Sequence, residues 1–283
     1  MKTIIIGAPR SGTNMLRDVL CEFEGVATWP CDEINYIWRH GNVRYPSDEI
    51  PAELATPEVQ SYIRKRFDWV AGHYRAHTVV EKTCANSLRV PFVDRVVPEA
   101  KYIFIYRDGL DATGSAKLRW KAKLDIPYLL EKVRFVPLTD LPYYGINYLW
   151  SHVHRLFSHE NRLAFWGPAL DDMSAILEQH TLNEVCALQW QRCVEKAEAA
   201  FGEMADDRVV RVCYEDFVQA PERELTRVLD FLGIQVPEDE VKAAVAGVSS
   251  RSVGKGRASL GDDETASLES LVGETLKHYG YDN

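Results

Sequence analysis

Short apolar runs alternate with helical patterns along most of this chain. Residues 3–6 are β-branched at every position, and similar runs follow at 78–80 and 102–106. A run that is apolar throughout is typical of a strand buried on both faces of a parallel sheet. Another strand is expected at 209–213, and a further strand region near 26–29.

Helical periodicity fills the segments between these runs. Apolar residues recur at helical spacing over residues 13–23, and helices are also expected at 90–97, 182–204 and 222–232. Because strands alternate with helices, the pattern predicts an α/β fold in which helices flank a parallel β-sheet.

Residues 123–181 break this regularity and are rich in tyrosine, tryptophan and phenylalanine. We expect them to form a helical insertion over the sheet, with most of the aromatic side chains packing it in place. The strands continue after the insertion, so the pattern predicts a single domain over residues 1–283.

Composition and charge narrow the partners and the compartment. A net charge of -9 leaves no wide basic face for nucleic acid. The six cysteines form no C-x-x-C pair, which favours free thiols in a reducing compartment. No apolar stretch approaches the roughly 20 residues that span a bilayer. We therefore expect a cytoplasmic protein without a membrane span or a nucleic-acid partner.

The segment Gly7-Ala8-Pro9-Arg10-Ser11-Gly12-Thr13-Asn14 lies between an expected strand and an expected helix. Backbone N–H groups and the positive end of the dipole at a helix N-terminus bind anions, and glycine permits close approach. The Arg10 guanidinium and the Ser11 and Thr13 hydroxyls add donors. The segment therefore predicts a phosphate-binding loop.

One position separates this loop from that of nucleoside-triphosphate enzymes. Their motif G-x-x-x-x-G-K-[ST] requires lysine where Thr13 stands, and no acidic strand end for Mg²⁺ is evident. A donor with a single 5′ phosphoanhydride fits better. A phosphate-loop kinase that uses a nucleoside triphosphate stays an alternative, as does a catalytically silent nucleotide-binding protein.

Two motifs carry a resemblance to a known family. Pro9 to Thr13 reads P-R-S-G-T, which resembles the 5′-phosphosulfate loop of the sulfotransferase superfamily that uses 3′-phosphoadenosine 5′-phosphosulfate (PAPS). Arg107 at a strand end, with Ser115 eight residues later, is similar to that family's 3′-phosphate site. Arg107 can grip a phosphate bidentately.

The resemblance implies a P-loop-like sulfotransferase fold of bacterial type. It implies an enzyme that transfers the sulfuryl group of PAPS to a hydroxyl or amine, releases 3′,5′-adenosine bisphosphate (PAP) and needs no metal. Two weaker matches follow. Tyr214 in a Y-E-D sequence is similar to the family's adenine contact, and Gly256-Arg257 is similar to a loop over the 3′-phosphate. Gly256-Arg257 lies in the segment 248–261, whose glycines among Ser, Lys and Arg are typical of a mobile anion-binding loop. The donor-binding residues implied are Arg10, Ser11, Gly12, Thr13, Asn14, Arg107, Ser115, Tyr214, Gly256 and Arg257.

The catalytic groups implied are a lysine and a carboxylate. Lys82 resembles the family lysine that contacts the sulfuryl oxygens, and Cys84 stands where cytosolic members carry their histidine base. Glu33, about 20 residues beyond the phosphate loop, matches the base of protein-tyrosine and some bacterial members. Glu81, directly before the lysine, matches the glycosaminoglycan enzymes. We favour Glu33 and keep Glu81 as the alternative.

Each of these residues also has an ordinary structural interpretation. Arg107 could form an ion pair, Tyr214 could cap the core, and Lys82 could be a solvated residue at a strand end. Asp32 could cap a helix. The acceptor pocket is expected to involve residues 34–40 and the aromatic insertion, which suits a glycan, a phenol, a lipid or a small metabolite.

Overall fold

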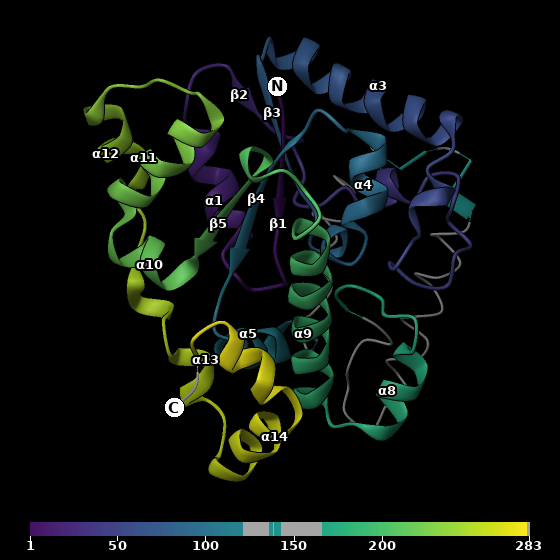
Figure 1. The fold of residues 1–283 in the computed structure, drawn as a ribbon, viewed down its shortest axis with the longest axis vertical. Coiled ribbons are helices and arrows are strands. Elements are labelled where there is room, and N and C mark those ends of the chain that lie inside the picture. The colour runs from purple at the N-terminus through teal and green to yellow at the C-terminus, as the bar shows by residue number, and fades with distance from the viewer. Residues whose placement is uncertain (121–135, 138, 143–165, 282–283) are drawn as a thin grey trace.

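Five parallel strands form one sheet in the order β2-β3-β1-β4-β5 (Figure 1). The computed structural model describes residues 1–120, 136, 137, 139–142 and 166–281. The strands are β1 (Lys2–Ile6), β2 (Val26–Ala27), β3 (Thr78–Lys82), β4 (Lys101–Tyr106) and β5 (Val209–Cys213).

Helices connect the strands and extend beyond them. Short 3₁₀ turns lie at 52–54, 84–88, 206–208 and 250–252. The described helices are α1 (Thr13–Leu20), α2 (Asn35–Trp38), α3 (Pro57–Tyr74), α4 (Val90–Val96), α5 (Gly109–Trp120), α8 (Met173–Gln179), α9 (Leu182–Phe201), α10 (Tyr214–Gln219), α11 (Pro221–Leu232), α12 (Glu238–Val245), α13 (Lys255–Ala258) and α14 (Asp262–His278).

The sheet is buried on both faces. Ile4 and Ile6 of β1 belong to one apolar cluster with α3, α4 and α9, whereas Ile5 belongs to another with α1, α11 and α12. All three isoleucines are fully buried. Figure 1 shows these two groups of helices on opposite sides of the sheet. The prediction of an α/β fold with a two-sided parallel sheet is confirmed.

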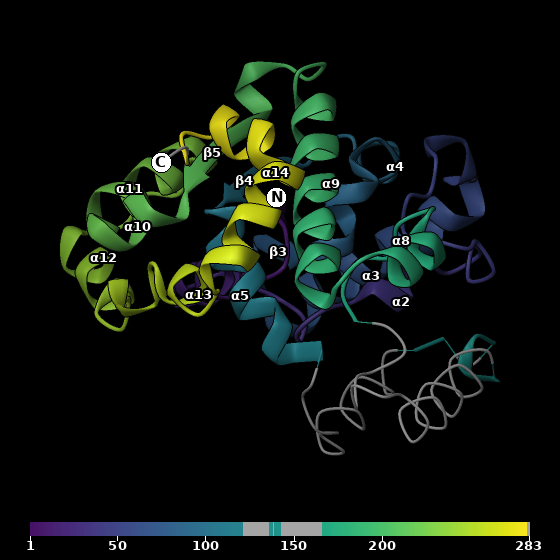
Figure 2. The same ribbon diagram turned by 90° about the horizontal axis from the view of Figure 1, so that it is seen from below.

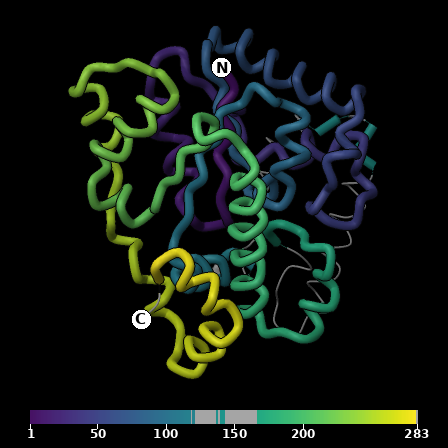
Figure 3. Tube along the Cα trace, in the orientation of Figure 1, coloured from purple at the N-terminus to yellow at the C-terminus, as the bar shows by residue number. Residues whose placement is uncertain are grey.

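The last segments of the chain return to the carboxyl ends of the strands. Helix α13 packs on α5, and α14 packs on α9. Figure 2 shows both contacts from below, and Figure 3 shows how a late part of the chain comes to lie beside residues 109–120. This arrangement brings residues 250–258 to the edge of the sheet where β1 and β4 end.

Several elements differ from the sequence prediction. Strand β2 is shorter than expected, and helices α3, α12 and α14 were not predicted. Segment 248–261 was expected to be a loop, but it contains two helical turns, at Ser250–Ser252 and Lys255–Ala258. Most of the predicted insertion 123–181 lies outside the described residues; α8 falls within it.

The described helices include none that is both long and apolar enough to cross a bilayer. The described residues likewise contain no group of three or more His, Cys, Asp or Glu placed to hold a metal ion.

Trp190 anchors α9 to the start of α5, and we expect its truncation to be costly. Its indole N–H donates to the Arg107 carbonyl at 3.1 Å, and a Cβ on Gly109 would lie 2.6 Å from the ring. Trp190→Phe should lower the free energy of unfolding by about 2 kcal/mol, through a small cavity and an orphaned carbonyl. Urea unfolding followed by far-ultraviolet circular dichroism measures the loss.

Trp69→Phe is the matched control, because Trp69 is 41% exposed and the same chemical change there should cost less than about 0.5 kcal/mol. Equal losses in the two variants would show that Trp190 does not anchor the helices.

Candidate active site

The loop between β1 and α1 has the backbone of an anion cradle. Arg10 and Gly12 both adopt left-handed conformations, with φ of 70° and 88°. No side chain caps the first turn of α1, whose N-cap is Gly12. The Ser11 hydroxyl is buried and has no hydrogen-bond partner among the described residues. An unpaired buried hydroxyl beside an uncapped helix start fits a bound anion.

The order of the strands places this loop between two other strand ends. Strand β1 pairs with β3 on one side and with β4 on the other. Lys82 ends β3, and Arg107 follows β4 directly. The phosphate loop is therefore flanked by a lysine at one side and an arginine at the other.

On the β3 side, Lys82 lies in a cluster of carboxylates. Its ammonium is 3.1 Å from Asp32 Oδ1 and 3.1 Å from Glu33 Oε1. Burial would lower the pKa of Lys82, but the charges of Glu33 and Asp32 outweigh it and hold the pKa above its ordinary value. The lysine is only 4% exposed, so it is not a solvated strand-end residue.

Asp32 connects this cluster to the phosphate loop. It accepts hydrogen bonds from the Asn14 amide at 2.7 Å and from Arg17 at 3.0 Å, in addition to its contact with Lys82. The residue before α2 is Ile34, so Asp32 is not the helix cap we had considered. Its partners come from two separate segments, α1 and β3, and no local sequence signal indicates them.

Glu33 is the more accessible of the two candidate bases. It accepts hydrogen bonds from the Lys82 ammonium and, at 3.3 Å, from the Cys84 backbone N–H, and its side chain is 28% exposed. Burial, followed by the charge of Glu33, raises the pKa of the Cys84 thiol well above its ordinary value. Cys84 is thus protonated near neutral pH and lies 3.8 Å from the Thr13 hydroxyl.

Glu81 lies on the other face of β3. It is fully buried and accepts hydrogen bonds from the Thr83 hydroxyl at 2.5 Å and from the Asn86 amide at 3.0 Å. Burial raises its pKa to about 7. Glu81 and Lys82 are neighbours in the chain, but their side chains have different partners.

On the β4 side, Arg107 and Arg10 converge on helix α5. Arg107 donates through Nη1 to the Arg10 carbonyl at 2.9 Å, and the Arg10 Nε donates to the Ser115 hydroxyl at 2.9 Å. Burial, then the charges of Arg119 and Arg107, lower the pKa of Arg10. The two predicted 3′-phosphate residues, Arg107 and Ser115, are therefore both hydrogen-bonded to Arg10 of the loop after β1.

Arg107 is also held by Asp111, a contact that sequence reasoning missed. The Arg107 guanidinium forms an ion pair with Asp111 Oδ2 and donates to the Ser252 carbonyl at 2.8 Å. Asp111 lies four residues after Arg107, a spacing at which helical side chains meet, so this partner was detectable. The ion pair is buried; it belongs to the site and is not a surface contact.

Tyr214 and the late segment complete this side. The Arg107 guanidinium stacks on the Tyr214 ring, and its Cζ lies 4.4 Å from the centroid of that ring. On the loop side, a Cβ on Gly12 would lie 2.4 Å from the same ring. The Tyr214 hydroxyl is 2.5 Å from Ser252 Oγ. The backbone N–H of Gly256 donates to Asp111, and the Arg257 side chain pairs with Asp108 at 3.0 Å.

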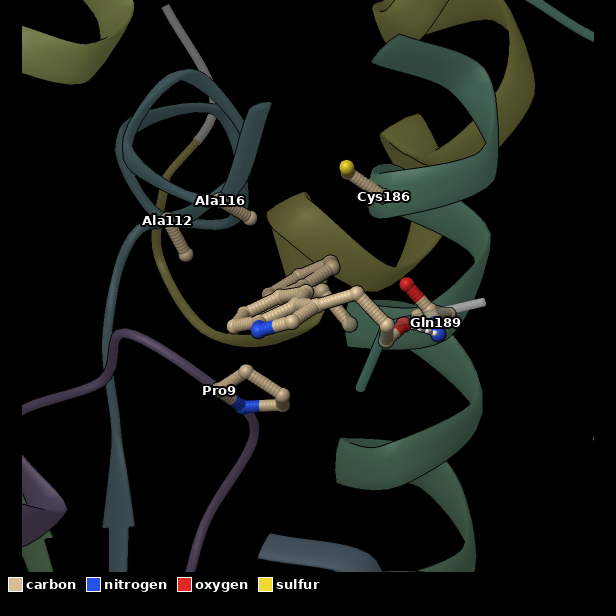
Figure 4. A pocket seen from close by; sticks show the side chains of 7 residues that line it. Pro9, Ala112, Ala116, Cys186 and Gln189 are labelled. Atoms are coloured by element: carbon tan, nitrogen blue, oxygen red, sulfur yellow. Dashed lines mark hydrogen bonds between the residues drawn. The ribbon is translucent and has the colours of Figure 1, made fainter. Parts of the chain in front are cut away.

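A small apolar pocket lies behind the phosphate loop. Pro9 faces it from the loop, Ala112 and Ala116 from α5, and Cys186 and Gln189 from α9 (Figure 4). The Gln189 amide nitrogen donates to the carbonyls of Trp166 and Pro168, so its two N–H donors are already used. The pocket thus lies between the loop, α5 and α9.

The sequence profile of the sulfotransferase family matches residues 3–160 and 152–238 of the chain. No curated protein sequence matches it.

Solved structures share its fold. The sulfotransferase domain from the curacin biosynthetic pathway is 12% identical, with a TM-score of 0.56 over 99% of this chain and 97% of that one. The sulfotransferase domain of the Synechococcus PCC 7002 olefin synthase is 15% identical, with a TM-score of 0.55 over 100% and 96%. Mouse sulfotransferase SULT7A1 is 14% identical, with a TM-score of 0.51 over 98% and 84%.

The buried Glu81 should make folding stability depend on pH. Its pKa is about 7 in the folded protein and about 4.5 in the unfolded chain. The folded state therefore binds the extra proton between these values, and its stability falls as pH rises through that window. Glu81→Gln mimics the protonated side chain, so at pH 8 the variant should be more stable than the wild type by about 3 kcal/mol.

Urea unfolding at pH 5 and pH 8 measures this effect. The variant and the wild type should differ little at pH 5, where burial of a protonated carboxyl carries no charge penalty. A variant that is less stable than the wild type at pH 8 would show that Glu81 is ionised and favourably paired.

Proposed function

The chain belongs to the sulfotransferase family, and we propose that it transfers the sulfuryl group of PAPS to a hydroxyl or amine of an acceptor. The observation that carries the proposal is that two candidate anion sites lie side by side. One is the loop after β1, and the other is the cluster in which Arg107 and Ser115 contact Arg10 of that loop. A nucleotide with anions at both its 5′ and 3′ positions needs two such sites. A mouse sulfotransferase of this fold was solved in complex with PAP.

The residues present suit such a nucleotide. The unpaired, buried Ser11 hydroxyl and the uncapped start of α1 would receive the 5′ group, together with Thr13 and Asn14. Arg107, Ser115 and the segment that carries Gly256 and Arg257, which Asp111 holds beside Arg107, would receive the 3′ group. Tyr214, which stacks on Arg107 beside Gly12, is the proposed adenine contact.

PAPS supplies an activated sulfuryl group whose bond to a phosphate oxygen breaks as the acceptor oxygen or nitrogen bonds to sulfur. The protein aligns the groups and offsets charge. We assign Lys82 to the sulfuryl and bridging oxygens, because its ammonium is held beside the phosphate loop by Asp32. Since that lysine stays charged, it can oppose negative charge without exchanging a proton.

We assign the acceptor's proton to Glu33 and not to Glu81. Glu33 is partly exposed and contacts Lys82, so an acceptor hydroxyl can reach it next to the transferred group. Glu81 has no exposed surface, and both of its oxygens already accept hydrogen bonds within the core. A base must contact the proton that it removes, and burial denies Glu81 that contact.

The acceptor can be found by mass. Radiolabelled PAPS incubated with the enzyme and a cell extract should yield a labelled product one sulfuryl group heavier than its precursor, whether glycan, phenol, lipid or small metabolite. Label that never leaves the donor, across extracts and an acceptor panel, would support a catalytically silent nucleotide-binding protein.

We expect PAP to stabilise the protein against heat and ATP with Mg²⁺ not to. The phosphate loop has Thr13 in place of the lysine that triphosphates require, whereas both anionic ends of PAP have partners. PAP at about one hundred times its dissociation constant should raise the melting temperature by several degrees. Differential scanning fluorimetry checks this, and stabilisation by ATP with Mg²⁺ alone would instead identify a phosphate-loop kinase.

Glu33→Gln should lower turnover at least roughly 100-fold while PAP affinity stays within about twofold. The amide keeps the shape of the side chain but cannot accept the proton. Glu81→Gln is the matched control and should retain most of the activity at pH 6.5. Steady-state label transfer gives turnover, and calorimetry gives PAP affinity. A loss confined to Glu81→Gln would move the base to that residue.

A further inference from the structure

Three side chains at successive turns of α5 form a stripe along one side of that helix. Asp111, Ser115 and Arg119 are spaced four residues apart, so they lie on the same face. Asp111 pairs with Arg107, and Ser115 accepts a hydrogen bond from Arg10. The stripe therefore continues one turn past Ser115, the last residue of the 3′-phosphate motif, to a cation that no motif marks.

Arg119 is exposed and is the cation of this stripe. No described residue forms an ion pair or hydrogen bond with it. Two other basic residues near this stripe are paired: Lys117 with Glu264, and Arg257 with Asp108 and Glu269. Because Lys117 and Arg119 lie two positions apart, they point in different directions from the helix.

The charges around Ser115 are unbalanced. Among the described residues, the guanidinium groups of Arg10, Arg107 and Arg119 gather there, and Asp111 is the carboxylate that pairs with one of them, Arg107. Burial and the positive charges of Arg119 and Arg107 lower the pKa of Arg10, which shows that these cations act on one another. An anion bound between them would relieve this repulsion.

The opposite end of the site has the reverse balance. The Lys82 ammonium contacts both Asp32 and Glu33, so its charge is already offset. Of the two ends, the one at Ser115 is therefore the one where positive charge exceeds negative charge among the described residues. A phosphate monoester is close to a dianion at neutral pH, so of the donor's anionic groups it would best match that charge.

We propose that Arg119 binds the 3′-phosphate of the donor, as a third arginine beside Arg10 and Arg107, and so increases selection for 3′-phosphorylated adenosine nucleotides. This inference rests on the proposed function. Arg119 acts from the solvent side, whereas Arg107 is buried and held by Asp111. Its loss should therefore reduce binding without disturbing the core.

Calorimetric titration with PAP and with AMP separates the 3′ contribution, because both carry a 5′-phosphate and only PAP carries the 3′-phosphate. In Arg119→Ala the dissociation constant for PAP should rise by about tenfold, as expected when one charge-assisted contact is lost, while that for AMP should stay unchanged. Arg119→Lys should recover part of the loss. Lys117→Ala, the matched control on the same helix, should bind both nucleotides as the wild type does.

The outcomes distinguish this inference from the proposed function. An unchanged ratio of PAP to AMP affinity in Arg119→Ala, or an equal loss for both nucleotides, would overturn the role of Arg119 at the 3′-phosphate. If the wild type did not prefer PAP to AMP, the proposed donor itself would be wrong. Unaltered thermal unfolding of the free variants confirms that any loss arises at the nucleotide site.

Discussion

The carboxylate of Asp111 is the group on which the β4 side of the proposed nucleotide site depends. It is 1% exposed, pairs with Arg107, and accepts hydrogen bonds from the backbone N–H groups of Gly254 and Gly256. A buried carboxylate without such partners would cost several kcal/mol. One buried charge therefore orients an arginine at the end of β4 and fixes a segment 145 residues away beside it. A Cβ at Gly256 would lie 1.9 Å from the Asp111 carbonyl, so only glycine permits this approach.

The order of the strands converts this local anchor into a site with two unlike ends. Because β1 is central, its loop has the end of β3 on one side and the end of β4 on the other. The β3 end pairs Lys82 with two carboxylates, which suits chemistry in which a proton leaves an acceptor. The β4 end collects arginines, which suits tight binding of a phosphate. A protein with a net charge of -9 thus keeps its anion-binding charge local.

The parts that could be predicted are those with a local physical cause. The buried strands could be located because a position enclosed on both faces must be apolar, and the unit of β1, loop and α1 because a strand, glycines and a helical pattern follow in order. Helix α3 was missed although Thr56 caps it and Val59, Ile63 and Phe67 follow at helical spacing. The role of Asp32 depends on partners brought together by the sheet, which no local pattern encodes.

The same geometry bears on the choice between two adjacent candidate bases. Successive side chains of a strand point to opposite faces, and β3 is regular through Lys82. Val79 packs in the apolar cluster on one face of the sheet, and Val80 packs in the cluster on the other face, with α1. Glu81 therefore points to the same face as Val79, and Lys82 points to the same face as Val80, toward α1. A lysine and the residue directly before it cannot both face the phosphate loop from a regular strand. The proposed base therefore lies in a different segment, the turn that carries Glu33, which contacts the Lys82 ammonium.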